Sequence, residues 1–158
     1  MATIEIVIAS TSELPAAQRF YECRGYGGAP IRNRDYVVLA RLQERIVGIG
    51  RLTEEDGLLW LRGMQVDPQF QRSGVGTRIL QRLSREIGDR RCCCLPYTHL
   101  VGFYRQAGFV QATDLPSGLA DRLADYVSRG LRVVAMVRAE RSRPDNLNLA
   151  SGGYRAHQ

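Results

Sequence analysis

The sequence predicts a single mixed α/β (α+β) domain, in which a central β-sheet is flanked by helices. Three consecutive β-rich runs in the first half favour antiparallel strands, and a later alternation of helix and strand patterns favours crossover connections. The length of 158 residues suits one core and is too short to favour two. We place the domain at residues 1–139 and expect the polar residues 140–158 to form a flexible tail.

The first half of the chain predicts four strands and one helix. Alternating β-branched residues, or apolar runs bounded by turn residues, indicate the strands. Ser12 is a candidate cap for the helix, which has Pro15 in its first turn. An interior glycine at Gly63 predicts a bulge or a close approach of another backbone. The predicted strands are Thr3–Ala9, Tyr36–Arg41, Arg45–Thr53 and Leu58–Val66, and the helix is Leu14–Tyr21.

The second half alternates between the two element types. An amphipathic helix follows Gly76, with an apolar face that includes Ile79 and Leu83, and Gly88 ends it. The predicted helix before the last strand is amphipathic too. After Gly88, the expected elements are a strand at Arg91–Leu95, a helix at Leu100–Ala107, a strand at Phe109–Gln111, a helix at Leu119–Ser128 and a strand at Leu131–Arg138.

Composition narrows the class of partner. The net charge is +6, and arginine supplies every basic side chain other than histidine because the chain contains no lysine. Arginine pairs bidentately with phosphate oxygens, so a phosphorylated cofactor or a nucleic acid suits the balance. The arginines are scattered and no nucleic-acid-binding motif accompanies them, which makes nucleic acid unlikely. No apolar run approaches the ~20 residues of a membrane helix, so we expect a cytoplasmic protein without membrane attachment.

The four cysteines predict no metal site and no disulfide. Cys92, Cys93 and Cys94 are adjacent, so on a strand they alternate between faces. They lack the C-x-x-C spacing of a zinc site, and Cys23 lacks a His/Asp partnership of the kind that activates a nucleophile. We interpret the three as small buried apolar residues in a reducing compartment.

The stretch Leu58–Gly76 predicts a phosphate cradle. A strand ends at Val66, Asp67-Pro68 makes a turn, and a helix opens just after Gly74. Such a helix start offers unpaired backbone N–H groups and a positive dipole end to an anion. A P-loop would need a lysine, which the chain lacks, and a dinucleotide fingerprint would need glycine where Ile79 stands.

A third pattern, Q/R-x-x-G-x-G/A after a strand ending in Val-Asp-Pro, is complete at Gln71, Gly74 and Gly76. Here the sequence resembles the GNAT superfamily of N-acetyltransferases, which use acetyl-coenzyme A. The segment Phe103–Phe109, FYRQAGF, is similar to a second motif of that family, and the two stand in the family's order. The element order also resembles the family's fold over about residues 3–138.

The resemblance implies the site. Backbone amides from Gln71 to Gly76 would hold the pyrophosphate, and the pantetheine arm would lie along the end of the preceding strand, where a main-chain N–H could polarise the thioester carbonyl. Tyr104 matches the family's general acid, although a tyrosine that only packs in the core is the alternative. The implied cofactor-binding residues are Met64, Gln65, Val66, Gln71, Arg72, Ser73, Gly74, Val75, Gly76 and Thr77.

The residues leave several points open. No general base stands out among the candidates Glu22, Glu54, Glu55, Asp56 and His99. An asparagine that many family members carry before the Phe-Tyr pair is missing from Tyr97–Leu100, and the helix Leu119–Ser128 is longer than the family's usual connection. Family members often pair, so a homodimer is possible. The alternative to an N-acetyltransferase acting on a small or peptide amine is a coenzyme A-binding sensor or interaction module without catalysis.

Overall fold

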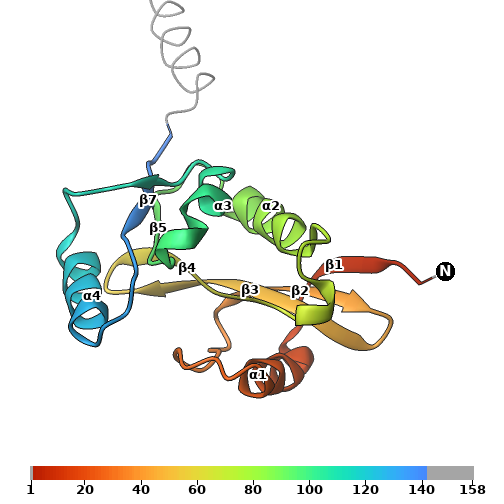
Figure 1. Ribbon diagram of the computed structural model, residues 1–158. Coiled ribbons are helices and arrows are strands. Elements are labelled where there is room, and N and C mark those ends of the chain that lie inside the picture. Colours follow the sequence, from red (N-terminus) through yellow and green to blue (C-terminus); the bar gives the residue numbers. More distant parts are fainter. Residues whose placement is uncertain (1, 142–158) are drawn as a thin grey trace, which may run out of the picture.

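The computed structural model describes residues 2–141, which form a seven-stranded sheet with helices on both faces (Figure 1). The predicted mixed α+β class is confirmed. The strands are β1 (Ile4–Ile8), β2 (Tyr36–Leu42), β3 (Arg45–Glu55), β4 (Leu58–Val66), β5 (Cys92–Cys94), β6 (Val110–Gln111) and β7 (Met136–Arg138). The α-helices are α1 (Leu14–Cys23), α2 (Val75–Ile87), α3 (Val101–Arg105) and α4 (Ser117–Ser128).

The sheet order is β1-β2-β3-β4-β5-β7-β6, and its one parallel pair is β4 with β5. The consecutive strands β2, β3 and β4 pair antiparallel, as their position in the sequence predicted, and β1 pairs antiparallel with β2 although α1 separates them in the chain. The Asp56-Gly57 turn between β3 and β4 has positive φ at both residues, +56° and +72°, which is the backbone of a tight type I′ hairpin turn. The sequential strands therefore form one half of the sheet, and the helix-connected strands form the other.

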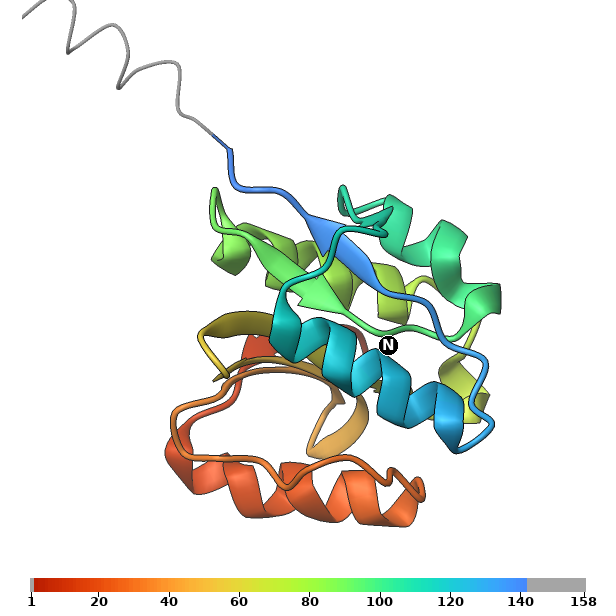
Figure 2. The same ribbon diagram turned by 90° about the vertical axis from the view of Figure 1, so that its left-hand side faces the viewer.

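Each of three helices buries a separate group of apolar side chains. The α2 helix lies over one face of the sheet and α1 covers the opposite face (Figure 1). The α4 helix crosses beside β5 and β7, where Leu119 packs on Trp60 and Cys93 (Figure 2). The group that includes the buried face of α2 is the largest of the three, and burial of apolar surface stabilises the fold in proportion to its area. The buried residues of α2 are Val75, Ile79, Leu80, Leu83 and Ile87.

Several element bounds differ from the predictions because pairing, rather than local pattern, ends a strand. The last strand was predicted from Leu131 but begins at Met136, since β5 offers only Cys92–Cys94 as a partner. Upstream of β7, Val133 makes a single bridge with Tyr97. The predicted helix Leu100–Ala107 is a 3-10 turn at Thr98–Leu100 followed by the short α3.

The helices α1 and α4 are both longer than predicted. The α1 helix continues past Tyr21 to Cys23, and α4 starts two residues earlier than Leu119, directly after Pro116. No helix of residues 2–141 is long and apolar enough to cross a membrane. The predicted polar tail lies almost wholly outside the described residues, at 142–158, and its flexibility remains a prediction together with the domain bound at residue 139.

Candidate active site

The site begins where β4 and β5 separate. The two strands meet at Trp60 and Cys93, and β5 ends one residue later. Beyond this point β4 continues to Val66 with β3 on one side only, so its other edge is left without a strand partner. Alternate N–H and C=O groups of that edge are therefore available to another molecule.

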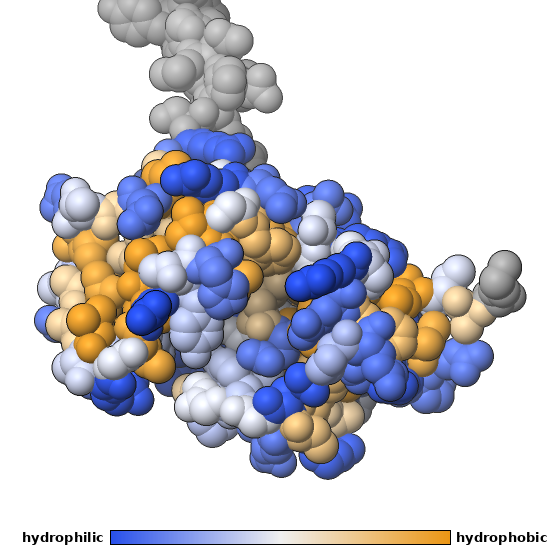
Figure 3. All heavy atoms as spheres, viewed as in Figure 1, coloured by the Kyte–Doolittle hydropathy of each residue, from blue (hydrophilic) through white to orange (hydrophobic). Residues whose placement is uncertain are grey.

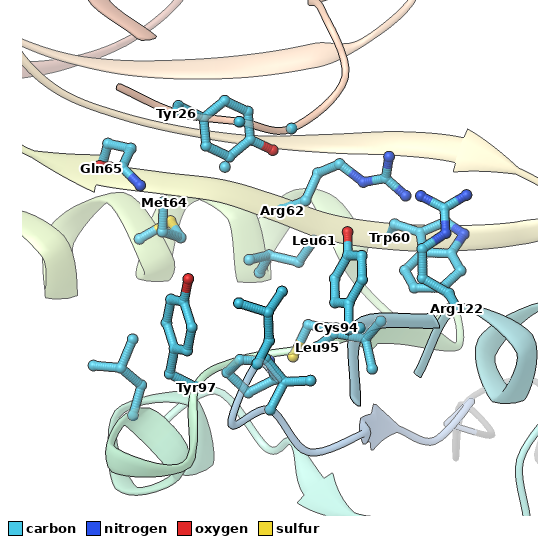
Figure 4. Close-up of a pocket in the computed structure, with 18 of the residues that line it drawn as sticks. Tyr26, Trp60, Leu61, Arg62, Met64, Gln65, Cys94, Leu95, Tyr97 and Arg122 are labelled. Atoms are coloured by element: carbon cyan, nitrogen blue, oxygen red, sulfur yellow. The ribbon is translucent and has the colours of Figure 1, made fainter. Parts of the chain in front are cut away.

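A cavity of about 400 Å³ fills the space that the separation opens. One wall is β4 from Trp60 to Gln65, and the opposite wall is the segment Cys94–Tyr97 with Leu100 and Tyr104. The close-up in Figure 4 shows Met64 and Gln65 at one end of the cavity and Trp60 with Arg62 and Arg122 at the other. The hollow opens on the face drawn in Figure 3. The remaining lining comes from the loop Gly25–Ala29, from α4 at Arg122 and Tyr126, and from Arg129, Leu131 and Val133 after it.

The interior glycine of β4 sits in a bulge, as predicted. The register between β3 and β4 shifts between Ile49 and Arg51, and Gly63 has φ +70°. A Cβ at this position would overlap the hydroxyl of Tyr21, which donates a 2.8 Å hydrogen bond to the Gly63 carbonyl. The bulge thus lets Tyr21 of α1 contact β4 at Gly63, a residue that also lines the cavity.

The glycine-rich loop after α1 is held in place by contacts with Tyr21 and Arg51. Tyr26 stacks on Tyr21, with 4.4 Å between the ring centroids, and the guanidinium of Arg51 lies near both rings. Arg51 donates a 2.6 Å hydrogen bond to the Ala29 carbonyl and pairs with Asp35 at 3.5 Å. Both partners of this ion pair are 1% exposed, so the loop that borders the cavity is fixed by a buried charge pair.

The predicted phosphate cradle is a concave turn at the start of α2. Arg72 has φ +62° and Gly74 has φ +87°, and Gly74 is the residue before the helix. Among residues 2–141, no acceptor is bonded to the backbone N–H groups of Val75, Gly76 and Thr77. A Cβ on Gly74 would meet nothing within 4 Å, so the turn is open on its outer side. Unbonded amides, a positive helix end and open space fit the pyrophosphate of coenzyme A.

The other cradle residues hold this shape. The Gln71 side chain donates a 2.9 Å hydrogen bond to the Val66 carbonyl, which ties the cradle to the end of β4. Asp67 accepts from the Gln69 N–H, and the Ser73 hydroxyl donates to the Phe70 carbonyl. Gln71 and Ser73 therefore support the turn with their side chains, whereas the exposed Arg72 side chain makes no ion pair within the described part of the chain.

The predicted site residues fall into two adjoining groups. Met64, Gln65 and Tyr104 line the cavity. The cradle residues Gln71–Thr77 lie beyond the end of β4, where Val66 packs within reach of Gly76. Val66 joins the groups without lining the cavity itself. The binding roles of all these residues remain predictions, but one continuous surface carries them.

Tyr104 is both a core residue and a cavity residue. Its ring packs edge-on against Phe103 and Phe109, and the residue is 6% exposed. Burial raises the pKa of its phenol above the usual value, with smaller contributions from Cys94 and Tyr26. The hydroxyl therefore keeps its proton at neutral pH and is available as a hydrogen-bond donor inside the cavity.

None of the candidate bases lines the cavity. Glu55 accepts hydrogen bonds from Arg122 and Arg62, and the Arg122 bond is the main reason that its pKa is lowered. Glu54 is exposed, and His99 stacks on the half-exposed ring of Tyr97. No cluster of three or more His, Cys, Asp or Glu side chains within residues 2–141 has the arrangement of a metal site.

Sequence reasoning did not find the arginines of the cavity. Arg62 is inside β4, Arg122 is on α4, and Arg129 directly follows α4, so the arginines come from segments far apart in the chain. The amphipathic pattern of α4 placed the helix but did not show which strand its polar face meets. The loop Gly25–Ala29 also lines the cavity, with Tyr26 as its largest side chain.

Comparisons with known proteins agree with this geometry. A family model described as an acetyltransferase (GNAT) domain matches residues 33–111, half of the chain. No curated protein matches the chain.

Solved structures share the fold at low sequence identity. N-acetylglutamate synthase from Neisseria gonorrhoeae is 23% identical with a TM-score of 0.61, and the match covers 90% of this chain but 36% of that one. The ribosomal-protein-S18-alanine N-acetyltransferase from Escherichia coli is 17% identical with a TM-score of 0.60, over 90% of this chain and 98% of that one. A GNAT acetyltransferase from Streptococcus pneumoniae is 15% identical with a TM-score of 0.64, over 85% and 98%.

The family match spans β2 to β6 and so includes both the cradle at the start of α2 and the cavity wall that carries Tyr104. The resemblance inferred from the two sequence motifs is confirmed: the chain belongs to the GNAT family of acetyltransferases.

Proposed function

We propose that the protein transfers the acetyl group of acetyl-coenzyme A to a primary amine by direct attack in a ternary complex. The observation that carries the proposal is the continuity of three features along one strand. The helix start with unbonded amides, the unpaired edge of β4 and the cavity beside Tyr104 follow one another without a break. A thioester cofactor with a phosphorylated end and an extended arm matches that order.

The cofactor would be held mainly by backbone groups. The amides of Val75, Gly76 and Thr77 would bind the pyrophosphate at the positive end of α2. The pantetheine arm would then hydrogen-bond along the free edge of β4, as an added strand does. The structural neighbour from Neisseria gonorrhoeae was solved with coenzyme A and N-acetyl-glutamate, which supports acetyl-CoA as the co-substrate in this fold.

The chain supplies two groups for the reaction. A β4 N–H near Met64 would donate to the thioester carbonyl oxygen, where negative charge develops when the amine attacks. Tyr104 would donate its proton or a hydrogen bond to the departing thiolate. Its raised pKa keeps the proton in place until the sulfur becomes an acceptor.

Deprotonation of the amine would pass through water. Among residues 2–141, no Asp, Glu or His side chain lines the cavity, so none of these side chains can take the proton directly. The amine would react in its neutral form, having released its proton to solvent at the open side of the cavity. We further propose a cytoplasmic setting, which the four free cysteines support.

The test has two stages. Acetyl-CoA at one hundred times its Kd should stabilise the folded protein by about 2.7 kcal/mol, and thiol release should then be measured against a panel of amines. Tyr104→Phe should lower kcat by about tenfold or more while acetyl-CoA still stabilises the variant. An absence of stabilisation by millimolar acetyl-CoA contradicts the proposal.

The two other candidate classes give different results in the same experiment. A coenzyme A-binding module without catalysis would be stabilised by the cofactor but would release no thiol with any amine. A nucleic-acid binder would show steeply salt-dependent affinity for DNA or RNA and no response to acetyl-CoA.

A further inference from the structure

The cavity wall opposite the thioester end carries an excess of positive charge. Its lining contains Arg62, Arg122 and Arg129 and, within the described part of the chain, no carboxylate. Arg129 is an exposed residue at the rim and pairs with Asp125 of α4. The charge inside the cavity is therefore set by Arg62 and Arg122.

A single carboxylate, that of Glu55, accepts hydrogen bonds from both arginines. Arg62 donates to Oε2 of Glu55 at 3.0 Å, and Arg122 donates to Oε1 at 2.7 Å. Glu55 itself does not line the cavity. Two guanidinium groups thus share a single negative charge, which leaves the cluster with a net charge of one positive unit. Each of them donates one hydrogen bond to Glu55 and keeps further N–H donors for another partner.

Both arginines also contact the Trp60 ring. The Arg62 and Arg122 guanidinium carbons lie 5.1 and 5.4 Å from the centroid of the Trp60 ring. Figure 4 shows the two groups side by side at this end of the cavity. The side chains are only 13% and 26% exposed, so solvent screens them less than surface arginines. Two guanidinium groups that are partly buried and held in place before a ligand arrives are well suited to bind a carboxylate bidentately.

The arginine pair and the reacting end lie in the same cavity. Arg62 and Met64 flank the Gly63 bulge of β4, and all three residues line the cavity. An acceptor with its amine beside Met64 and Tyr104 would place a carboxylate at the arginines if a few carbon atoms separate the two groups. A second amine in that position would face two guanidinium groups instead.

From this geometry we propose that the acceptor is a small amino carboxylic acid, whose carboxylate is bound by Arg62 and Arg122 while its amine is acetylated. The proposal rests on the proposed acetyltransferase function and names its substrate class. In the reaction, the ammonium group first loses one proton to water. The amine nitrogen then forms an amide bond to the acetyl carbon, the carbon–sulfur bond breaks, the sulfur takes a proton from Tyr104, and the second proton lost by the nitrogen restores the Tyr104 hydroxyl. The carboxylate of the acceptor is unchanged.

Three five-carbon compounds test the charge preference without turnover. Glutarate, glutaramide and cadaverine have similar length but carry two negative, no and two positive charges. Added to the complex with coenzyme A, glutarate should raise the melting temperature, and cadaverine should not. Equal or greater stabilisation by cadaverine overturns the proposal.

Turnover with L-glutamate and cadaverine as acceptors gives the second readout. Arg62→Gln and Arg122→Gln should each raise the KM for L-glutamate by about tenfold or more, with a smaller change in kcat. Arg122→Lys keeps the positive charge but loses the planar guanidinium group. Its KM for L-glutamate should therefore lie between those of the wild type and Arg122→Gln. Arg19→Gln removes one exposed charge on α1, away from the cavity, and should leave the kinetics and glutarate binding unchanged.

The results also separate the two proposals. Each variant must still be stabilised by acetyl-CoA, which shows that it folds and binds the cofactor. Efficient acetylation of cadaverine, or unchanged KM for L-glutamate in both glutamine variants, contradicts the carboxylate site and leaves the acetyltransferase intact. No response to acetyl-CoA in the wild-type protein contradicts both.

Discussion

The Tyr21 hydroxyl donates a hydrogen bond to the Gly63 carbonyl across 42 positions of sequence, at 2.8 Å. Tyr21 belongs to α1 on one face of the sheet, and Gly63 lies in the strand whose free edge borders the cavity. The bond satisfies a carbonyl that the bulge removes from the regular β3–β4 ladder. This hydrogen bond therefore links α1 directly to the strand that forms one wall of the cavity.

Gly63→Ala should destabilise the protein by about 2–4 kcal/mol, because the left-handed backbone and the overlap with Tyr21 add. Gly57→Ala is the matched control. Gly57 has a similar φ but open space around its Cβ position, so only the backbone cost of about 1–2 kcal/mol applies. Urea unfolding measures both, and equal losses would show that contact with Tyr21 does not matter.

Arg51→Met should cost about 3–5 kcal/mol, since it leaves Asp35 buried without its charge partner. Adding Asp35→Asn should recover part of the loss. Arg45→Met removes the exposed partner of Asp67 and should have a much smaller effect. If the single Arg51 variant unfolds at the wild-type urea concentration, the buried pair does not anchor the loop.

Thr77→Glu should act in opposite directions on stability and on cofactor binding. A carboxylate in the first turn of α2 favours the helix by about 0.3–1 kcal/mol, but it repels the pyrophosphate. We expect acetyl-CoA affinity to fall about tenfold or more, measured by calorimetry, while the free protein unfolds no earlier. Gln81→Glu adds the same charge further along α2 and should leave affinity unchanged. Similar affinities for the two variants would place the phosphates elsewhere.

Cys23 should be the fast-reacting thiol of the folded protein. It is exposed, whereas burial raises the pKa of Cys92 and of Cys93 to about 12 and also raises the pKa of Cys94 well above its usual value. Iodoacetamide at about pH 8 should therefore label one site quickly and the other three only after unfolding, because the thiolate is the reactive form. Mass spectrometry identifies the sites, and rapid labelling of a second cysteine in the native protein contradicts the prediction.

Glu55 should contribute to stability at neutral pH and lose this contribution in acid. Its pKa lies below the ordinary value of 4.5, chiefly through the hydrogen bond from Arg122. A lowered carboxyl pKa stabilises the folded state fully above the unfolded value, and the effect disappears as the pH falls through the folded value. The unfolding free energy of Glu55→Gln should thus fall less steeply below about pH 4.5 than that of the wild type. Parallel curves would show that the Arg122–Glu55 contact is not linked to folding.

The local parts of the fold were predictable because their chemistry is local. Asp56-Gly57 makes a turn wherever it stands between two β-rich runs, and the apolar spacing after Gly76 allows only a helix with one buried face. The bulge at Gly63 followed from the absence of a side chain in an otherwise apolar strand. Element ends such as Met136 were missed, since the length of β7 depends on how much of β5 remains to pair with it.

The sequence by itself determined the antiparallel pairing of β2, β3 and β4, the glycine turn before α2 and the family, because each depends on local patterns of residues. Only the tertiary structure decided what the cavity presents to an acceptor. Periodicity says that one face of a helix is buried, but not which strand it meets. Arg122 joins Arg62 and Glu55 because α4 packs beside β4 and β5, and that contact gathers three charges that are scattered in the sequence into one cluster.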